Sequence, residues 1–171
     1  MTDSSIFDTP LIRYIAYAIA ILLLAIAQLL VSPLIAFENI YPNFLLIFTV
    51  AVALREGQLV GLGAAFLAGL TYDVIGNVLL GVNAMASILA VFLAGYFYRE
   101  GRFRQTVGSF KFPIIVALSA FVYNLVYHIL LIEPTELDFM ALFTTYGIAA
   151  TLYTTVISVI PMLIVARKSQ F

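Results

Sequence analysis

The chain has 171 residues, of which 64% are hydrophobic and only 10% are charged, with a net charge of −1 at pH 7 and a mean hydropathy of +1.11. Charged residues make up about 25% of a typical soluble domain, so the composition excludes a soluble protein and predicts a single integral membrane domain over residues 1–171. The absence of cysteine excludes disulfides, thiolate metal sites and a catalytic thiol, and the small net charge indicates no nucleic-acid partner.

The hydrophobic runs predict an all-helical protein with six transmembrane helices. A helix needs roughly 20 apolar residues to cross about 30 Å of hydrocarbon. The first run exceeds this length, and we expect it to stay as an uncleaved anchor because no basic segment precedes it. The second run is short and needs Pro42, a residue suited to the first turn of a helix, to lengthen it. The predicted spans cover residues 12–36, 42–55, 58–80, 82–98, 112–132 and 139–166.

Basic residues gather on one side of these six spans. With the N-terminus inside, all eight Lys and Arg residues fall in inner segments. The charged residues of the outer loops are all acidic. Cytoplasmic loops carry an excess of Lys and Arg, so the segregation predicts cytoplasmic N- and C-termini and requires the short second run to cross. The inner residues are Arg13, Arg55, Arg99, Arg102, Arg104, Lys111, Arg167 and Lys168, and the outer acids are Glu38, Asp73, Glu133, Glu136 and Asp138.

The most basic inner segment is the loop over residues 99–111, with Phe103 and Phe110 between its cations. A solvated loop that follows the positive-inside rule, a surface that lies against anionic lipid headgroups, and a contact with the acidic surface of a protein partner are three interpretations that stay open. The cations are Arg99, Arg102, Arg104 and Lys111.

Small residues recur at every fourth position of the third span. In a helix such a step turns by only about 40°, so the residues form a ridge that drifts slowly around the helix. Helices in a bilayer associate through close backbone packing, which small residues permit, so the ridge predicts an interface for a partner's transmembrane helix. The predicted contact residues are Gly57, Gly61, Ala65 and Gly69.

Polar residues gather at the predicted outer ends of the spans. Asp73 is the main candidate, because an acid within a membrane span often faces the bundle interior or a water-filled cavity, although a structural role is an equal alternative. His128 lies at a similar depth, and one hypothesis is that it meets Asp73, while a neutral histidine satisfied by a neighbouring group is the more common arrangement. One His and one Asp indicate neither a hydrolytic site nor a metal site. The cluster predicts a shallow binding cavity or a packing seam for another helix, and consists of Asn43, Asp73, Asn77, Asn83 and His128.

Gln28 and several tyrosines are assigned to helix packing and to the membrane interface. Gln28 is predicted to form a hydrogen bond between helices without a chemical function. Tyrosines near the predicted interfaces are typical of the aromatic belt of membrane proteins. These tyrosines are Tyr14, Tyr17, Tyr41, Tyr72, Tyr96 and Tyr98.

Residues 41–94 resemble the MreD family of rod-shape-determining membrane proteins. The resemblance rests on Pro42-Asn43 before a short helix, Arg55-Glu56-Gly57, Gly61, Phe66, Gly69-Leu70, Asp73, Leu80-Gly81 and Asn83-Ala84, and outside residues 41–94 it extends to length and layout only. It implies a fold similar to the substrate-binding subunits of energy-coupling-factor transporters.

The resemblance also implies a function without enzymatic activity or cofactor in the bacterial cytoplasmic membrane. The protein would bind the single-span MreC protein and link it to RodA and a class B penicillin-binding protein, with MreB filaments as an indirect partner, while self-association stays open. The alternative function is the substrate-binding membrane subunit of a vitamin-type transporter, in which Asp73, Asn77 and Asn83 would contact the ligand.

Overall fold

A computed structural model describes residues 10–38, 40–131, 140 and 143–168, and within these residues the chain is helical, with no β-strand. The prediction of an all-helical chain is therefore confirmed. The described elements are α1 (Pro10–Val31), η2 (Ser32–Ile35), α2 (Phe44–Glu56), α3 (Gln58–Ile75), α4 (Val82–Gly95), α5 (Phe103–Val107), α6 (Lys111–Leu131), the π-helical η3 (Phe143–Gly147) and α8 (Ile148–Lys168).

Four of the described segments are long and apolar enough to cross a membrane, namely α1 with η2, then α3, then α6, and finally η3 with α8. Helices α2 and α4 have 13 and 14 residues, which at 1.5 Å per residue is about 20 Å. They are shorter than the hydrocarbon layer, so length alone does not make them crossings.

The helices differ from the prediction after α3 and in the basic loop. The third helix stops at Ile75 instead of residue 80, because Asn77, which follows the C-cap Gly76, turns the chain with a φ of +50°. The basic loop contains a short helix, α5, that the sequence analysis did not predict. The predicted outer acids Glu133, Glu136 and Asp138 lie outside the described residues.

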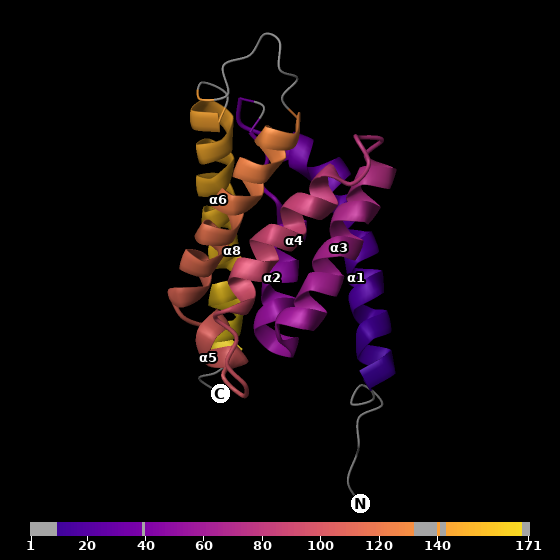
Figure 1. Cartoon of the computed structure of the whole chain (residues 1–171). Helices are drawn as coiled ribbons and strands as arrows, with labels where there is room; N and C mark the ends of the chain where they lie inside the picture. The colour runs from indigo at the N-terminus through magenta and orange to yellow at the C-terminus, as the bar shows by residue number, and fades with distance from the viewer. Residues whose placement is uncertain (1–9, 39, 132–139, 141–142, 169–171) are drawn as a thin grey trace, which may run out of the picture.

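The long helices alternate in direction (Figure 1). Helices α1, α3 and α6 run away from the end of the bundle that holds α5, and α2, α4 and α8 run toward it. We call the end with α5 the basic end, because the Arg and Lys residues of the described chain lie in α5, in the loop before it or in the terminal turns of helices that start or stop there. The opposite end is called the far end.

Helix α2 forms the centre of the bundle because its residues are apolar on all sides. Leu46 and Val50 belong to a core with α4, α6 and Met162 of α8. Leu45 and Val52 belong to a second core with α1 and α3 on the other side. A helix that is hydrophobic all round is typical of a buried position.

The ridge of small residues is used for packing inside the chain. A Cβ atom added at Gly61 would lie 2.4 Å from the Cβ of Ala53 in α2, and one added at Gly69 would lie 2.4 Å from the Cα of Ala84 in α4. Ala65 is fully buried. The predicted ridge is therefore already filled by the neighbouring helices α2 and α4, and a partner's helix would have to displace one of them. The ridge residues are Gly57, Gly61, Ala65 and Gly69.

The outside of the bundle is covered by large apolar side chains. Leu59 on α3 is 85% exposed and Leu152 on α8 is 62% exposed. Contiguous exposed apolar surface of this kind is unusual for a soluble monomer and fits a protein that faces lipid.

Candidate functional site

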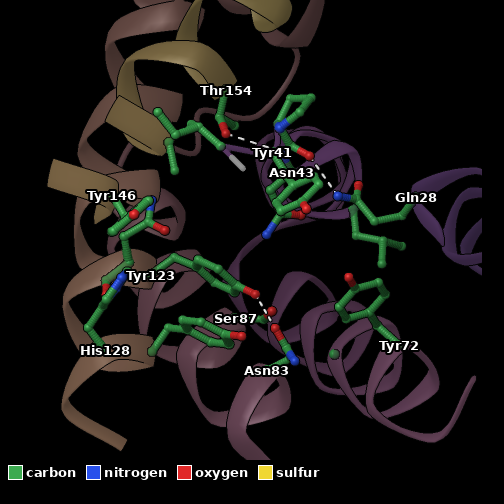
Figure 2. A pocket seen from close by; sticks show the side chains of 17 residues that line it. Gln28, Tyr41, Asn43, Tyr72, Asn83, Ser87, Tyr123, His128, Tyr146 and Thr154 are labelled. Carbon is green, nitrogen blue, oxygen red and sulfur yellow. Dashed lines mark hydrogen bonds between the residues drawn. The ribbon is translucent and has the colours of Figure 1, made fainter. Parts of the chain in front are cut away.

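The far half of the bundle encloses a cavity of about 290 Å³ (Figure 2). Its walls come from α1, α3, α4, α6 and α8, from η3 and from the extended segment that leads into α2. Side chains that line it carry amide, hydroxyl and imidazole groups, and five are tyrosines. The polar lining residues are Gln28, Tyr41, Asn43, Tyr72, Asn83, Ser87, Tyr123, Asn124, Tyr127, His128, Tyr146 and Thr154.

One wall of the cavity is the N-terminus of α2. Asn43 is the N-cap, and its Oδ1 accepts a hydrogen bond from the backbone N–H of Leu46 at 2.9 Å. The backbone N–H of Asn43 donates to Oγ1 of Thr154 on α8 at 3.1 Å. The prediction that Pro42 begins the helix is corrected by two residues, because Pro42 lies before the cap and the first helical residue is Phe44.

Gln28 connects α1 to the chain that enters α2. Its Nε2 donates to the backbone oxygen of Pro42 at 2.6 Å, and its Oε1 accepts from the backbone N–H of Phe44 at 2.8 Å. These backbone groups have no partner within a helix, and Gln28 satisfies both of them. The amide side chain thus performs the hydrogen bonding predicted for it, and it also allows an extended segment to lie inside the bundle.

Asp73 caps helix α4 from the neighbouring helix α3. Its side chain is buried, with the residue 1% exposed. Oδ2 accepts from the backbone N–H of Gly81 at 2.8 Å and of Ala84 at 3.4 Å, and Oδ1 accepts from the backbone N–H of Asn83 at 3.3 Å. A carboxylate is favoured at a helix N-terminus because the unpaired N–H groups carry partial positive charge. The structure thus gives Asp73 a structural contact and not a place on the cavity surface.

A chain of hydrogen bonds links this cap to the cavity. Nδ2 of Asn83 donates to Oδ1 of Asp73 at 2.7 Å, and Oδ1 of Asn83 accepts from the hydroxyl of Tyr123. Tyr123 stacks on Tyr127, with ring centroids 5.9 Å apart and ring planes at 10°. The carboxylate thereby orients the amide of Asn83, and Asn83 orients the first of two parallel rings.

His128 lines the cavity but does not meet Asp73. Its Nδ1 lies 2.7 Å from the backbone oxygen of Asn124, and a carbonyl oxygen only accepts, so Nδ1 carries a proton. In the neutral tautomer with this contact, Nε2 is the acceptor. The predicted contact between His128 and Asp73 is wrong, because both groups are bound by other partners and Asp73 lies behind Asn83.

The other predicted polar residue lies elsewhere. Asn77 is exposed in the turn between α3 and α4 and is not part of the cavity lining. Of the predicted cluster, the structure places Asn43, Asn83 and His128 on the cavity.

The sequence analysis missed the tyrosines of the cavity. Tyr41 and Tyr72 were assigned to the aromatic belt, but both line the cavity. Tyr123 and Tyr127 are four residues apart and so share a helix face, a signal that indicated a common surface.

A second cavity, of about 350 Å³, lies at the basic end. Its lining includes Arg99, Arg102 and Lys111 together with the aromatic rings of Tyr96 and Phe97. The predicted basic loop therefore brings three of its four cations to one surface, whereas Arg104 of α5 is not in this lining.

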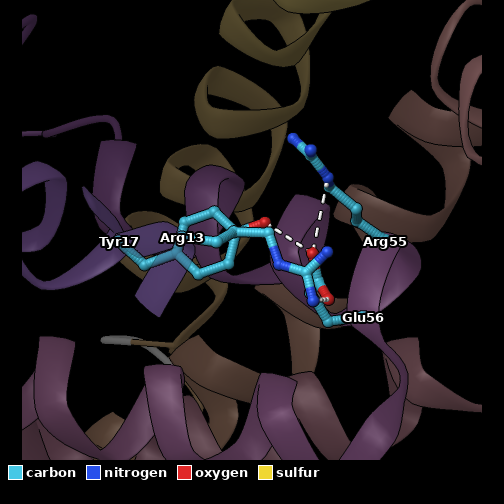
Figure 3. A network of polar contacts seen from close by, with 4 residues as sticks. All are labelled: Arg13, Tyr17, Arg55 and Glu56. Atoms are coloured by element: carbon cyan, nitrogen blue, oxygen red, sulfur yellow. Dashed lines mark hydrogen bonds and ion pairs between the residues drawn. The ribbon is translucent and has the colours of Figure 1, made fainter. Parts of the chain in front are cut away.

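A third polar cluster joins α1 to the end of α2 (Figure 3). Glu56 accepts a hydrogen bond from the hydroxyl of Tyr17 at 2.7 Å and forms an ion pair with Arg13 at 3.0 Å. Arg55 lies 3.4 Å from the same carboxylate. The sequence analysis named Glu56 only for the resemblance and missed this contact between helices.

Comparison with known proteins identifies a family. The family model described as rod shape-determining protein MreD matches residues 11–168. No curated protein and no solved structure gives a significant match. Because the match covers nearly the whole chain, including all the long helices and the cavity, the chain belongs to the MreD family of rod shape-determining membrane proteins.

Proposed function

We propose that the chain is a non-enzymatic scaffold of the bacterial cell-wall elongation machinery. In this proposal it binds the transmembrane helix of MreC and links it to RodA and a class B penicillin-binding protein, with MreB reached indirectly. The observation that carries the proposal is the family match over residues 11–168. The role of Asp73 supports the absence of enzymatic activity in this proposal. Asp73 is the main candidate for a catalytic acid, and both of its carboxylate oxygens accept hydrogen bonds from the first residues of α4 and the residue before it.

The same proposal includes six membrane crossings in the cytoplasmic membrane, with both termini in the cytoplasm. The common basic end and the alternating helix directions support it. The cavity lined by Arg99, Arg102 and Lys111 would then face the inner leaflet, where anionic headgroups attract basic segments.

We propose that the partner's helix packs on the outward face of α3, beside the ridge predicted from the sequence. Gly63 is exposed there, and a Cβ atom added to it would meet no atom within 4 Å. Leu59, Phe66 and Leu67 on the same helix are exposed as well. A small residue between bulky ones allows the backbone of another helix to approach closely.

The Gly63→Leu variant tests this surface. We expect it to insert and fold, because the position is open, but to lose co-purification with MreC in mild detergent. Gly69→Leu is unsuitable, because its side chain would collide with the backbone of Ala84. The matched control is Val156→Phe, which adds bulk to an exposed position on α8 and should leave co-purification unchanged.

Two results would contradict the proposal. Full recovery of MreC with Gly63→Leu would exclude the α3 surface, and no recovery with the unchanged chain would exclude the scaffold. The second result would favour the vitamin-type transporter subunit, for which the cavity in the far half is the supporting observation.

A further inference from the structure

The polar groups on the cavity in the far half fall into two sets. The amides of Gln28, Asn43, Asn83 and Asn124 are bonded to the chain itself and hold the walls in place. A second set of hydroxyl groups lines the same space without a hydrogen bond to any described residue. This second set consists of Ser87, Tyr72 and Tyr127 inside the cavity and of Tyr41 and Tyr146, which are more exposed.

Ser87 is the most informative member of the second set. The residue is 6% exposed and lies on α4, one turn after Asn83. Figure 2 shows it beside the bond between Tyr123 and Asn83. Within the described chain its oxygen is not one of the fully buried polar atoms that lack a partner, so it is reached from the cavity that it lines. A ligand or water in the cavity can therefore supply its hydrogen bond.

The charge of the lining restricts the ligand. The described residues that line the cavity are uncharged when His128 is neutral, and the nearby carboxylate of Asp73 is bonded to the start of α4. A buried ion needs an opposite charge, so a charged ligand would be disfavoured. A purely apolar ligand would leave the hydroxyl groups of Ser87 and Tyr127 without partners. The lining therefore favours an uncharged ligand that is rich in groups able both to donate and to accept hydrogen bonds.

The shape of the lining restricts the ligand further. The stacked rings of Tyr123 and Tyr127 both line the cavity, and a face of C–H groups packs well on an aromatic ring. His128, the next residue along the chain, offers Nε2 as an acceptor when its ring is neutral. A volume of about 290 Å³ is at the small end of ligand sites and suits a single ring with its substituents. Tyr41 and Tyr146 line the cavity and are 43% and 40% exposed, so it reaches the surface.

We propose that this cavity binds an uncharged polyhydroxylated ring, such as one sugar or cyclitol unit. Its hydroxyl groups exchange hydrogen bonds with Ser87, Tyr72 and Tyr127 and donate one to Nε2 of His128, while its C–H face packs on an aromatic ring of the Tyr123–Tyr127 pair. The proposal goes beyond the scaffold function and does not depend on it, since the α3 surface around Gly63 is not part of the cavity lining.

The test measures binding of small neutral rings to the full chain in lipid nanodiscs. Maltoside detergents are avoided because they carry the same chemical group as the ligand. The probes are glucose, N-acetylglucosamine and myo-inositol, and the charged counterparts are glucosamine and glucuronate. Saturation-transfer NMR reports which ligand protons contact the protein, and a titration gives the dissociation constant.

We expect at least one neutral ring to bind saturably and more tightly than its charged counterpart. The Ser87→Ala and Tyr127→Phe variants each remove one hydroxyl and keep the fold, and should weaken binding about tenfold, the effect of one lost hydrogen bond. The matched control is Tyr96→Phe, which removes an exposed hydroxyl at the basic end and should bind like the unchanged chain.

Three results would overturn the proposal. The first is the absence of saturable binding for every neutral ring, and the second is equal or tighter binding of the charged counterparts. The third is unchanged binding by both Ser87→Ala and Tyr127→Phe. Co-purification with MreC is measured on the same samples, so failure of the ligand proposal is distinguished from failure of the scaffold proposal.

Discussion

Asp73 shows how one residue can connect two helices in a protein with few charges. Its carboxylate lies at the end of α3 but receives its hydrogen bonds from the first residues of α4. Hydrogen bonds to a charged group are stronger than those between neutral groups, and here they replace the water that would otherwise reach the start of α4. The tight turn between these helices therefore depends on one side chain.

We predict that Asp73→Ala lowers the melting temperature of the purified protein more than Asp73→Asn. Alanine leaves several buried N–H groups without an acceptor, at a cost of about 1–3 kcal/mol each, whereas asparagine keeps one oxygen. The measurement is thermal unfolding in nanodiscs. Glu100→Gln, which changes an exposed acid at the basic end, is the control for loss of charge alone. Equal melting temperatures for Asp73→Ala and Glu100→Gln would contradict the capping role.

Sequence reasoning located part of the cavity at this scale. Asn43, Asn83 and His128 were predicted as a polar cluster because they share the outer ends of the predicted spans, and all three line the cavity. The tyrosines were missed because a tyrosine near a helix end is equally typical of an aromatic belt and of a cavity wall. The packing of the helices around the cavity decides between these roles, and that packing is not visible in residue spacing.

At the scale of elements, α1 is held to the bundle differently from the other helices. It packs against α2 and α3 and carries polar contacts near both of its ends. Gln28 binds the chain before α2 at one end, and Arg13 and Tyr17 bind Glu56 at the other. Lipid supplies little hydrophobic force for helix association, so these polar contacts contribute to the position of α1.

We predict that Arg13 and Glu56 are energetically coupled. The Glu56 side chain is 8% exposed and that of Arg13 is 36% exposed, so removal of one partner leaves the other poorly solvated. In a double-mutant cycle with Arg13→Met and Glu56→Gln, the melting temperature of the double variant should fall by less than the sum of the single variants. A coupling of about 1 kcal/mol is expected.

The control for this cycle is Arg55→Met. The Arg55 side chain is 52% exposed and lies 3.4 Å from the same carboxylate, so its coupling to Glu56 should be smaller. Additive effects of Arg13→Met and Glu56→Gln would show that the ion pair does not position α1.

Sequence reasoning at this scale recovered the helices better than their contacts. Hydropathy placed every long helix, because each is a continuous apolar run. The ridge of small residues was recognised, but its assignment to a partner did not consider α2 and α4, which pack on it at Gly61 and Gly69. A periodic pattern indicates close packing and does not identify the helix that provides it.

At the scale of the whole molecule, charge and apolar surface divide the protein into clear regions. The described Arg residues lie at one end, and exposed large apolar side chains surround the helices between the ends. Cationic residues are retained on the cytoplasmic side of bacterial membranes, so this arrangement supports the proposed orientation, in which the basic end faces the cytoplasm.

We predict that a thiol at the basic end is shielded from outside the cell. The chain has no cysteine, so single-cysteine variants report one position each. Arg102→Cys should react with a membrane-impermeant maleimide only after the cells are opened, and Leu79→Cys, in the exposed turn between α3 and α4, should react in intact cells. Reaction of Arg102→Cys in intact cells would reverse the orientation.

The central position of α2 also determines how the protein can be made. Alone, this helix covers only about 20 Å, and the extended segment before it has peptide groups that rely on Gln28 and Thr154 for partners. Hydrocarbon offers peptide groups no replacement for those partners. Gln28 precedes this segment in the chain, but Thr154 follows it by 111 residues. We therefore expect α2 to reach its final position only after α8 has been synthesised and can supply the partner for Asn43.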